Sequence, residues 1–299
     1  MRLHTTWRIG GPADFLVRAP TPDDVLAAVQ WGRDRGLPIT TIGGGANLLA
    51  GDGGIRGLVI LIRTPGEKAE HLAEAEDLGD VVRLRLAAQA PLSWSGRYTA
   101  ERGWAGLDWG VGLPGTIGGA TVNNAGAHGV EQKDHLASVT LLDLETGGIV
   151  EQPGSWMEAA YRHTVIKAAP RPRRWVVLAA TLELPKGDPA ELVRLAEEHA
   201  EFRKRTQPTG ACAGSTFANP PGDFAGRLLE ACGMKGFQVG GVGFSPKHAN
   251  WVVNDGSATA ADVRALLAEA KSRVRERFGI ELRQEVEDLG EPDDRSNGG

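Results

Sequence analysis

Two glycine-rich segments carry the strongest chemical signal in this sequence. The first reads Gly43-Gly44-Gly45-Ala46-Asn47-Leu48-Leu49, and the second runs from Gly110 to Ala127. Glycine lets consecutive backbone N–H groups converge on one anion, and it lets a ligand approach the main chain closely. The first segment can therefore wrap a phosphate, and the second can lie against a flat ligand. A tight turn at the end of a strand remains the alternative for the first segment taken alone.

Neither segment carries a common nucleotide-binding fingerprint. The first has no Gly-x-Gly-x-x-Gly opening a helix, as in Rossmann folds, and no Gly-Lys-Ser/Thr, as in Walker loops. The second has too much glycine for a helix and too little charge for a solvated loop. The two segments together favour a ligand that is held mainly by the backbone.

Composition excludes several other classes of protein. The 299 residues include 33 basic and 38 acidic side chains, so the net charge of -5 gives no basis for nucleic-acid binding. An anionic substrate then needs a local basic pocket. Cys212 and Cys232 are too few for a disulfide framework or a four-ligand zinc site, and we expect no bound metal. The absence of a long apolar stretch or secretory signal predicts a cytoplasmic protein.

Helix and strand signals alternate around the two glycine segments. Thr21 and Pro22 can begin a helix over 21–37, which Gly36 can end. A strand over 38–42 leads into the first glycine segment, and a strand over 57–62 follows it. Further strands are expected over 81–88, 139–144 and 174–184, with a hairpin turn at Gly147-Gly148 within 143–150.

The last third of the chain reads as a separate region. Pro185-Lys-Gly-Asp-Pro189 is the best candidate for a linker, so we expect a domain boundary near residue 188. Helices are predicted over 190–204, 223–232 and 259–278, and Thr259 with Asp262 forms a capping signal for the last of these. Alternation over 280–286 predicts a strand, and 291–299 reads as a disordered tail.

Seven motifs, in order, resemble those of the UDP-N-acetylenolpyruvoylglucosamine reductases, which are flavoenzymes of peptidoglycan synthesis. The resemblance covers nearly the whole chain. The motifs are Thr-Thr-x-x-Ile-Gly-Gly-Pro-Ala from Thr5, the Gly43–Leu49 loop, Gly112-Leu-Pro-Gly-Thr-Ile-Gly-Gly119, Asn124-Ala-Gly-Ala127, Tyr161-Arg162, Ala213-Gly-Ser-Thr-Phe-Ala-Asn-Pro220 and Ser245-Pro-Lys-His-Ala-Asn-Trp-Val-Val-Asn254.

The resemblance implies an α+β fold with a two-lobed FAD-binding region of the PCMH type, not a Rossmann fold. With the linker above, this region would occupy 1–188, in lobes of about 1–62 and 63–188. A smaller α+β substrate-binding domain would occupy 189–290. The implied reaction is the reduction of a UDP-linked enolpyruvyl sugar by NADPH, mediated by FAD that is not covalently attached.

The resemblance also implies which residues contact the cofactor. The first glycine segment would hold the FAD pyrophosphate and the second would line the flavin. The implied contacts are Gly43, Gly44, Gly45, Ala46, Asn47, Leu48, Gly112, Pro114, Gly115, Thr116, Gly118, Gly119, Asn124, Ala125 and Gly126.

Three residues match the catalytic positions of the family. Arg162 would stabilise the enolate that forms when hydride reaches the terminal methylene carbon, because a guanidinium meets a carboxylate at two points. Glu285 would assist it, and beside a second carboxylate we expect this glutamate to be protonated. Ser215 would deliver the proton to the substrate carbon. Without the family, these positions read as a surface arginine, an exposed charged strand and a turn.

Cations are needed for the substrate phosphates. Arg203, Lys204 and Arg205 precede Ser215, and Lys247 and His248 lie in the last family motif, so these residues are candidate substrate contacts. A solvated helix end is an equally good interpretation of Arg203 to Arg205, because basic side chains suit the negative pole of a helix. Asn219 matches a family substrate contact.

Some positions depart from the family pattern. Ala46 replaces a common serine, and Thr164 replaces the serine of Tyr-Arg-x-Ser. Tyr98 and Tyr161 are the only tyrosines, so the chain resembles the shorter, open-pocket subgroup that lacks a tyrosine-bearing loop.

Two rival functions remain. One is another FAD oxidoreductase on the same scaffold, although His128 follows the Asn-Ala-Gly motif and is badly placed for a covalent flavin link. The other is a non-catalytic protein that binds flavin or a nucleotide sugar. The joint presence of Arg162, Ser215 and Glu285 argues against this second rival.

Overall fold

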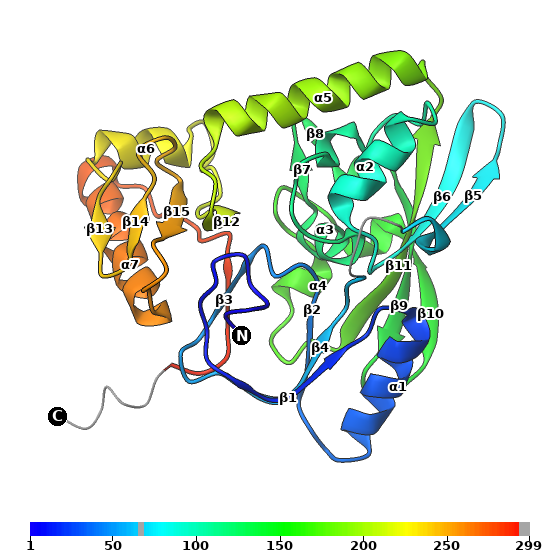
Figure 1. The fold of residues 1–299 in the computed structure, drawn as a ribbon, viewed down its shortest axis with the longest axis horizontal. Coiled ribbons are helices and arrows are strands. Elements are labelled where there is room, and N and C mark those ends of the chain that lie inside the picture. The colour runs from blue at the N-terminus through cyan, green and yellow to red at the C-terminus, as the bar shows by residue number, and fades with distance from the viewer. Residues whose placement is uncertain (65–68, 293–299) are drawn as a thin grey trace. The chain divides into compact units, whose positions relative to one another are not determined.

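The computed structural model describes residues 1–64 and 69–292, and it divides into two compact units (Figure 1). The central unit consists of Phe15–Gly44 and Gly57–Arg203. The split unit consists of three separate segments, Met1–Asp14, Gly45–Arg56 and Lys204–Gly299. Each unit has its own hydrophobic core.

The largest sheet of the central unit has five antiparallel strands in the order β10-β9-β11-β6-β5. Strand β11 (Trp175–Pro185) is central, and its side chains are buried along most of its length. This burial explains its nearly continuous apolar sequence. The other strands are β5 (Ala73–Asp77), β6 (Val81–Ala87), β9 (Leu136–Asp143) and β10 (Ile149–Pro153).

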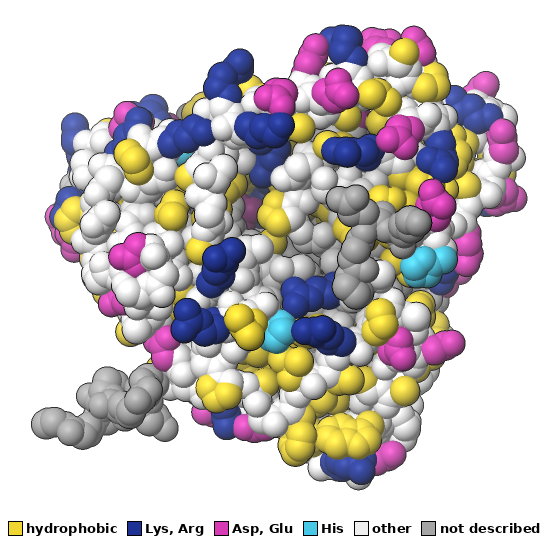
Figure 2. Space-filling model, in the orientation of Figure 1, with side chains coloured by type: hydrophobic (Ala, Val, Ile, Leu, Met, Phe, Trp, Pro, Cys, Tyr) yellow, Lys and Arg dark blue, Asp and Glu magenta, His cyan; other side chains and the backbone are white. Residues whose placement is uncertain are grey.

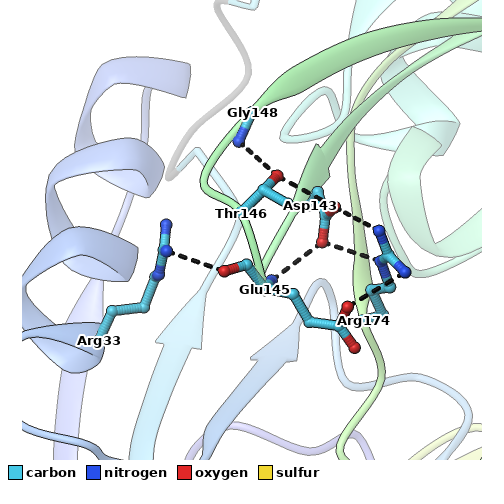
Figure 3. Close-up of polar contacts among 6 residues, drawn as sticks. All are labelled: Arg33, Asp143, Glu145, Thr146, Gly148 and Arg174. Atoms are coloured by element: carbon cyan, nitrogen blue, oxygen red, sulfur yellow. Dashed lines mark hydrogen bonds and ion pairs between the residues drawn. The ribbon is translucent and has the colours of Figure 1, made fainter.

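The predicted hairpin at 143–150 is confirmed, and a buried carboxylate organises its turn (Figure 3). Asp143 accepts hydrogen bonds from the Glu145 amide and the Thr146 hydroxyl, and it forms an ion pair of 2.7 Å with Arg174. The Arg174 guanidinium holds the pKa of Asp143 well below its usual range. Arg33 of helix α1 (Pro22–Arg33) donates to the Glu145 carbonyl and ties this helix to the turn.

A second sheet in the central unit has the order β1-β4-β2. Strands β2 (Ile39–Ile42) and β4 (Ile55–Leu61) are parallel, and β1 is Ala13–Arg18. Helix α1 begins where the sequence predicts, because Thr21 and Asp24 form a complete capping box. The helix ends at Arg33, three residues before Gly36, which has a φ of 61°.

The second glycine segment contains a helix, contrary to the sequence prediction. Helix α3 (Ile117–Asn123) begins at Thr116, whose hydroxyl accepts from the Gly119 amide. A Cβ on Gly118 would lie 2.8 Å from the Ala88 Cβ, so glycine allows this helix to pack directly on the segment that follows β6. Close packing outweighs the low helix propensity of glycine here. The remaining elements of the central unit are α2 (Leu92–Ala100), β7 (Gly126–Ala127), β8 (Val130–Glu131) and α4 (Val165–Ala168).

Helix α5 (Pro189–Thr206) belongs mainly to the central unit, although the linker signal placed a boundary before it. Its Leu192 and Ala196 pack with Ala100 and Val111, which holds the helix to this unit up to Arg203. The compact units therefore differ from the expected ranges 1–188 and 189–290. A further difference is that the first fourteen residues group with the C-terminal part of the chain.

The split unit is built on a four-stranded antiparallel sheet with the order β12-β15-β14-β13. Its core includes Trp7 from the N-terminal segment, whose indole N–H donates to the Val252 carbonyl at 2.8 Å. The side chain of Asn254 donates in turn to the Trp7 carbonyl. The elements are β12 (Ala211–Ser215), α6 (Ala225–Ala231), β13 (Gln238–Val239), β14 (Val242–Phe244), β15 (Trp251–Asn254) and α7 (Ala260–Phe278).

The predicted strand over 280–286 is wrong. Gln284 forms a single bridge with Phe217, and regular pairing begins only at β16 (Glu287–Leu289), which runs parallel to β3 (Leu48–Ala50). Pro220 has no N–H to continue the ladder beyond the bridge. The segment therefore lies extended without forming a strand.

The predicted end of the ordered chain is also displaced. Glu291 pairs with Gly54 and donates its amide to the Gly54 carbonyl at 2.8 Å, so order continues past residue 290. Residues 293–299 of the expected tail lie outside the described residues. Within the described part of the chain, no helix combines the length and apolarity needed to cross a membrane.

Candidate functional site

The two glycine segments meet within the central unit. A Cβ on Gly43 would lie 2.5 Å from the Thr116 hydroxyl, and a Cβ on Gly44 would lie 2.6 Å from the Gly115 Cα. A side chain on Gly44 would push against the opposite main chain, and one on Gly43 would displace the Thr116 hydroxyl. Gly115 has a φ of 123°, and a Cβ there would meet no atom within 4 Å, so its backbone faces open space. The loops form a cradle made of main chain.

The rest of the second segment lies on either side of Gly115 and Thr116 along the chain. Gly112 donates its amide to the Ser93 hydroxyl, and a Cβ on it would lie 3.9 Å from Ala200 and Arg203 of α5. Pro114 is exposed, and Gly119 is half-buried in the first turn of α3. Gly118 is buried against Ala88, so packing already explains why this position is glycine.

The first glycine segment continues into the split unit. A Cβ on Gly45 would lie 2.1 Å from the His4 carbonyl oxygen, so this glycine is needed for close backbone contact. The Asn47 side chain donates to the Glu285 carbonyl at 3.2 Å, and the Asn47 carbonyl accepts from the Glu287 amide at 3.0 Å. Ala46 and Leu48 flank Asn47 and are half-buried. The segment therefore fixes the backbone at Glu285.

Ser215 and Glu285 come together within the split unit. Ser215 ends β12 after a register shift, and the preceding Gly214 has a φ of 75°. Such irregularities re-aim side chains next to functional sites. The Glu285 amide donates to the Thr216 carbonyl at 2.9 Å, so Glu285 is anchored one residue from Ser215. Both side chains belong to half-buried residues.

Asn250 clamps the chain immediately after Ser215. Its side-chain oxygen accepts from the Phe217 amide at 3.0 Å, and its side-chain nitrogen donates to the Phe217 carbonyl at 2.8 Å. Its own carbonyl accepts from the Thr216 amide. Asn250 was not among the predicted site residues, although it lies within the last family motif. No sequence pattern indicates that its side chain would bond to both the amide and the carbonyl of Phe217.

Arg162 lies in the central unit in an uncommon backbone conformation. It occupies the third position of a tight turn closed by hydrogen bonds between Ala160 and His163, and its φ is 54°. Non-glycine residues seldom adopt this region, and such strain concentrates at functional sites. The guanidinium donates to the carbonyls of Asn124 and Gly126 at 3.2 and 2.9 Å, which fixes its plane.

Asn124 is fully buried, and its side chain is committed to the interior of the central unit. Its nitrogen donates to the Glu131 carboxylate at 3.0 Å and to the Ala160 carbonyl at 2.9 Å, and its oxygen accepts from the Lys133 amide. Only 1% of its surface is exposed. These bonds use both side-chain N–H groups. Ala125 and Gly126 are half-buried beside it.

The candidate phosphate contacts are divided between the two units. Arg203 is half-buried in the central unit, whereas Lys204 and Arg205 are exposed in the split unit. The Lys247 ammonium donates to the Lys204 carbonyl at 2.6 Å. The side-chain oxygen of Asn219 accepts from the Ala225 amide near the start of α6.

His248 also has a structural contact. Its Nδ1 accepts from the Asn250 amide at 3.2 Å, and burial lowers the pKa of its imidazole. The ring is therefore mostly neutral near pH 7, which makes it a hydrogen-bonding group and not a fixed cation for a phosphate.

Sequence reasoning missed a histidine pair in the central unit. The rings of His128 and His199 stack with centroids 3.8 Å apart, and Asp108 lies 3.4 Å from His199. Burial, with His199 and Arg203 nearby, lowers the pKa of His128. The two histidines lie on different elements, so no sequence spacing could have indicated this contact.

The surface carries charges of both signs on the face drawn in Figure 2.

The model of an FAD binding domain matches residues 13–152, and that of a UDP-N-acetylenolpyruvoylglucosamine reductase C-terminal domain matches residues 206–289. The second range contains Ser215 and Glu285, and the first contains the cradle.

Curated relatives match along nearly their whole length. A UDP-N-acetylenolpyruvoylglucosamine reductase from Rubrobacter xylanophilus is 40% identical, over 98% of this chain and 94% of its own. The protein of that name from Anaeromyxobacter sp. is 43% identical, over 96% and 86%.

A solved structure agrees with these relatives. The UDP-N-acetylenolpyruvylglucosamine reductase from Thermus caldophilus superposes with a TM-score of 0.76 at 31% identity, covering 96% of each chain. This likeness confirms the α+β fold that the sequence motifs imply. The chain belongs to the UDP-N-acetylenolpyruvoylglucosamine reductase family.

Proposed function

We propose that this protein reduces UDP-N-acetylenolpyruvoylglucosamine to UDP-N-acetylmuramate for peptidoglycan synthesis, with NADPH as reductant and FAD as cofactor. The observation that carries the proposal is the match to reductases of this name along nearly the whole chain. Arg162, Ser215 and Glu285 stand at sequence positions that resemble the family's catalytic positions, which supports it further.

The residues present fit FAD. In the cradle of Gly43, Gly44, Gly115 and Thr116, a Cβ on Gly44 would clash with the opposite main chain and one on Gly43 would meet the Thr116 hydroxyl. The space beside Gly115 is open. Backbone amides in such a loop can receive a pyrophosphate. FAD held by these residues would supply the hydride chemistry that links NADPH oxidation to reduction of the terminal methylene carbon of the enolpyruvyl group.

Arg162 would bind the carboxylate of the enolpyruvyl group and neutralise the negative charge that develops there. The bonds to Asn124 and Gly126 hold its guanidinium in advance, so little reorganisation is needed when charge appears. Its permanent charge suits this task, because a guanidinium does not lose its proton in a protein.

Ser215 would donate its hydroxyl proton to the carbon next to the carboxylate. Hydride and proton together saturate the double bond, which leaves a lactyl ether as product. A serine is a weak acid, but an enolate is a strong base, so this transfer is favourable. Glu285 would donate a hydrogen bond to the developing charge as a neutral acid. The substrate phosphates would be met by the basic residues Arg203, Lys204, Arg205 and Lys247, together with Asn219 and His248.

An anaerobic two-step experiment tests the proposal. NADPH should bleach the yellow colour of the bound cofactor, and the enolpyruvyl UDP-sugar should restore it with stoichiometric formation of the lactyl ether. Bleaching without recovery by this sugar would contradict the substrate, and recovery only by oxygen would favour an oxidase.

A further inference from the structure

Asn124 connects three pieces of the central unit that surround Arg162. It is the C-cap of α3 and has a left-handed φ of 43°. Its side chain donates to the Glu131 carboxylate at the end of β8 and to the Ala160 carbonyl at the start of the tight turn that contains Arg162. Its own main-chain carbonyl accepts directly from the Arg162 guanidinium. Asn124 therefore contacts both the turn that carries the Arg162 backbone and the Arg162 guanidinium, which carries the charge.

The hairpin that follows Asn124 supplies the second support for Arg162. Gly126 lies in β7 and accepts from the guanidinium, while Glu131 lies opposite it in β8. A Cβ on Gly126 would lie 2.3 Å from the Val130 carbonyl, so the hairpin is tightly closed. The bond from Asn124 to Glu131 therefore fixes the position of β8. Strand β7, which pairs with β8, provides the Gly126 carbonyl.

We infer that Asn124 is a positioning residue for Arg162, acting through the Glu131 and Ala160 contacts, and is not a cofactor contact. This inference rests on the function proposed above. A guanidinium stabilises developing charge only if it is already aimed at it, and misplacement by about 1 Å can slow a reaction about 100-fold. Arg162 has a long, flexible side chain on a strained turn, so both of its ends need support.

The substitution Asn124→Gly tests the inference with little backbone strain, because glycine accepts the left-handed φ. It removes the bonds to Glu131 and Ala160 but keeps the carbonyl that faces Arg162. We expect the rate at which the enolpyruvyl sugar reoxidises the reduced cofactor to fall about 10- to 100-fold. The affinity for FAD and the rate of reduction by NADPH should stay within about threefold of wild type.

Two further variants separate positioning from general damage. Glu131→Gln keeps an oxygen that can accept from Asn124, so it should retain most of the wild-type reoxidation rate. Glu158→Gly replaces an exposed left-handed residue with a φ of 45° and removes no bond to Arg162, so it controls for the backbone effect of introducing glycine.

A double-mutant cycle decides the mechanism. If Asn124 acts through Arg162, then Asn124→Gly should have little further effect on reoxidation in an Arg162→Lys background, because the guanidinium it positions is gone. An undiminished effect in that background would overturn the inference, as would an equal loss of FAD affinity. A wild-type protein whose cofactor is never reoxidised by the sugar would instead overturn the proposed function.

Discussion

The two units hold their candidate site residues in different ways. In the central unit, backbone loops press against each other and Arg162 rests on two carbonyls that belong to a buried network. In the split unit, Ser215 lies at the irregular end of β12 and Glu285 lies outside any strand, and the chain beside them is held by Asn250 and Asn47. The proposed cofactor cradle therefore depends on the absence of side chains, whereas the positions of Ser215 and Glu285 depend on single side-chain clamps.

The largest effect is expected in the split unit from Ser215→Ala. Loss of the hydroxyl removes the proposed proton donor without opening a cavity, so steady-state turnover should fall about 100-fold or more. The melting temperature should change little, because the residue is only half-buried. Turnover close to wild type would show that Ser215 merely shapes the end of β12.

Two substitutions of Glu285 should give a graded loss. Glutamine can still donate a hydrogen bond to the enolate, so Glu285→Gln should slow turnover by about tenfold, and Glu285→Ala should slow it more. Steady-state rates of the two variants provide the measurement. Equal damage by Gln and Ala would indicate a charged base, and no effect from either would remove Glu285 from the site.

In the central unit, Gly44→Ala should act on the cofactor. The added Cβ would lie 2.6 Å from the Gly115 Cα, so the two loops must separate, and we expect FAD to bind about tenfold more weakly. Fluorescence titration of the apoprotein with FAD measures this affinity. Gly187→Ala is a matched control, because Gly187, like Gly44, has no left-handed φ and its Cβ would make only ordinary contacts with Leu192, at 3.6 Å or more. Equal losses of affinity would indicate a general backbone effect.

The smallest effect concerns the stability of the central unit. Asp143→Asn should lower the melting temperature by a few degrees near pH 7, because it removes the charge that pairs with Arg174. The pKa of Asp143 is depressed in the folded state, so its ionisation stabilises the fold above about pH 4. This contribution is lost as the pH falls further. Thermal melts at pH 7 and pH 3 should therefore show a smaller difference between variant and wild type at pH 3.

Local signals predicted much of the fold. The capping boxes at Thr21 and Thr259 form as their spacing indicates, and the glycines at 147 and 148 turn the hairpin between β9 and β10. These features are encoded within a few residues, so their physics is visible in the sequence. The family motifs likewise identified the α+β fold and the two glycine segments.

Tertiary contacts decided the rest. Helix α3 forms in a glycine-rich segment because Gly118 packs on Ala88, and the strand expected over 280–286 is replaced by a single bridge. Asn124 matched a family motif, but its buried bonds to Glu131 and Ala160 depend on segments that meet only in three dimensions. The roles of Arg162, Ser215 and Glu285 remain predictions.

The contrast between cofactor cradle and proton donor is tested most directly by stopped-flow measurement of both half-reactions in Ser215→Ala. The variant should be loaded with FAD and mixed anaerobically first with NADPH and then with the enolpyruvyl UDP-sugar. Bleaching should proceed at nearly the wild-type rate, and the return of colour should be slowed about 100-fold or more. Equal slowing of the two steps would contradict it, because Ser215 would then support the fold or the cofactor and not deliver a proton.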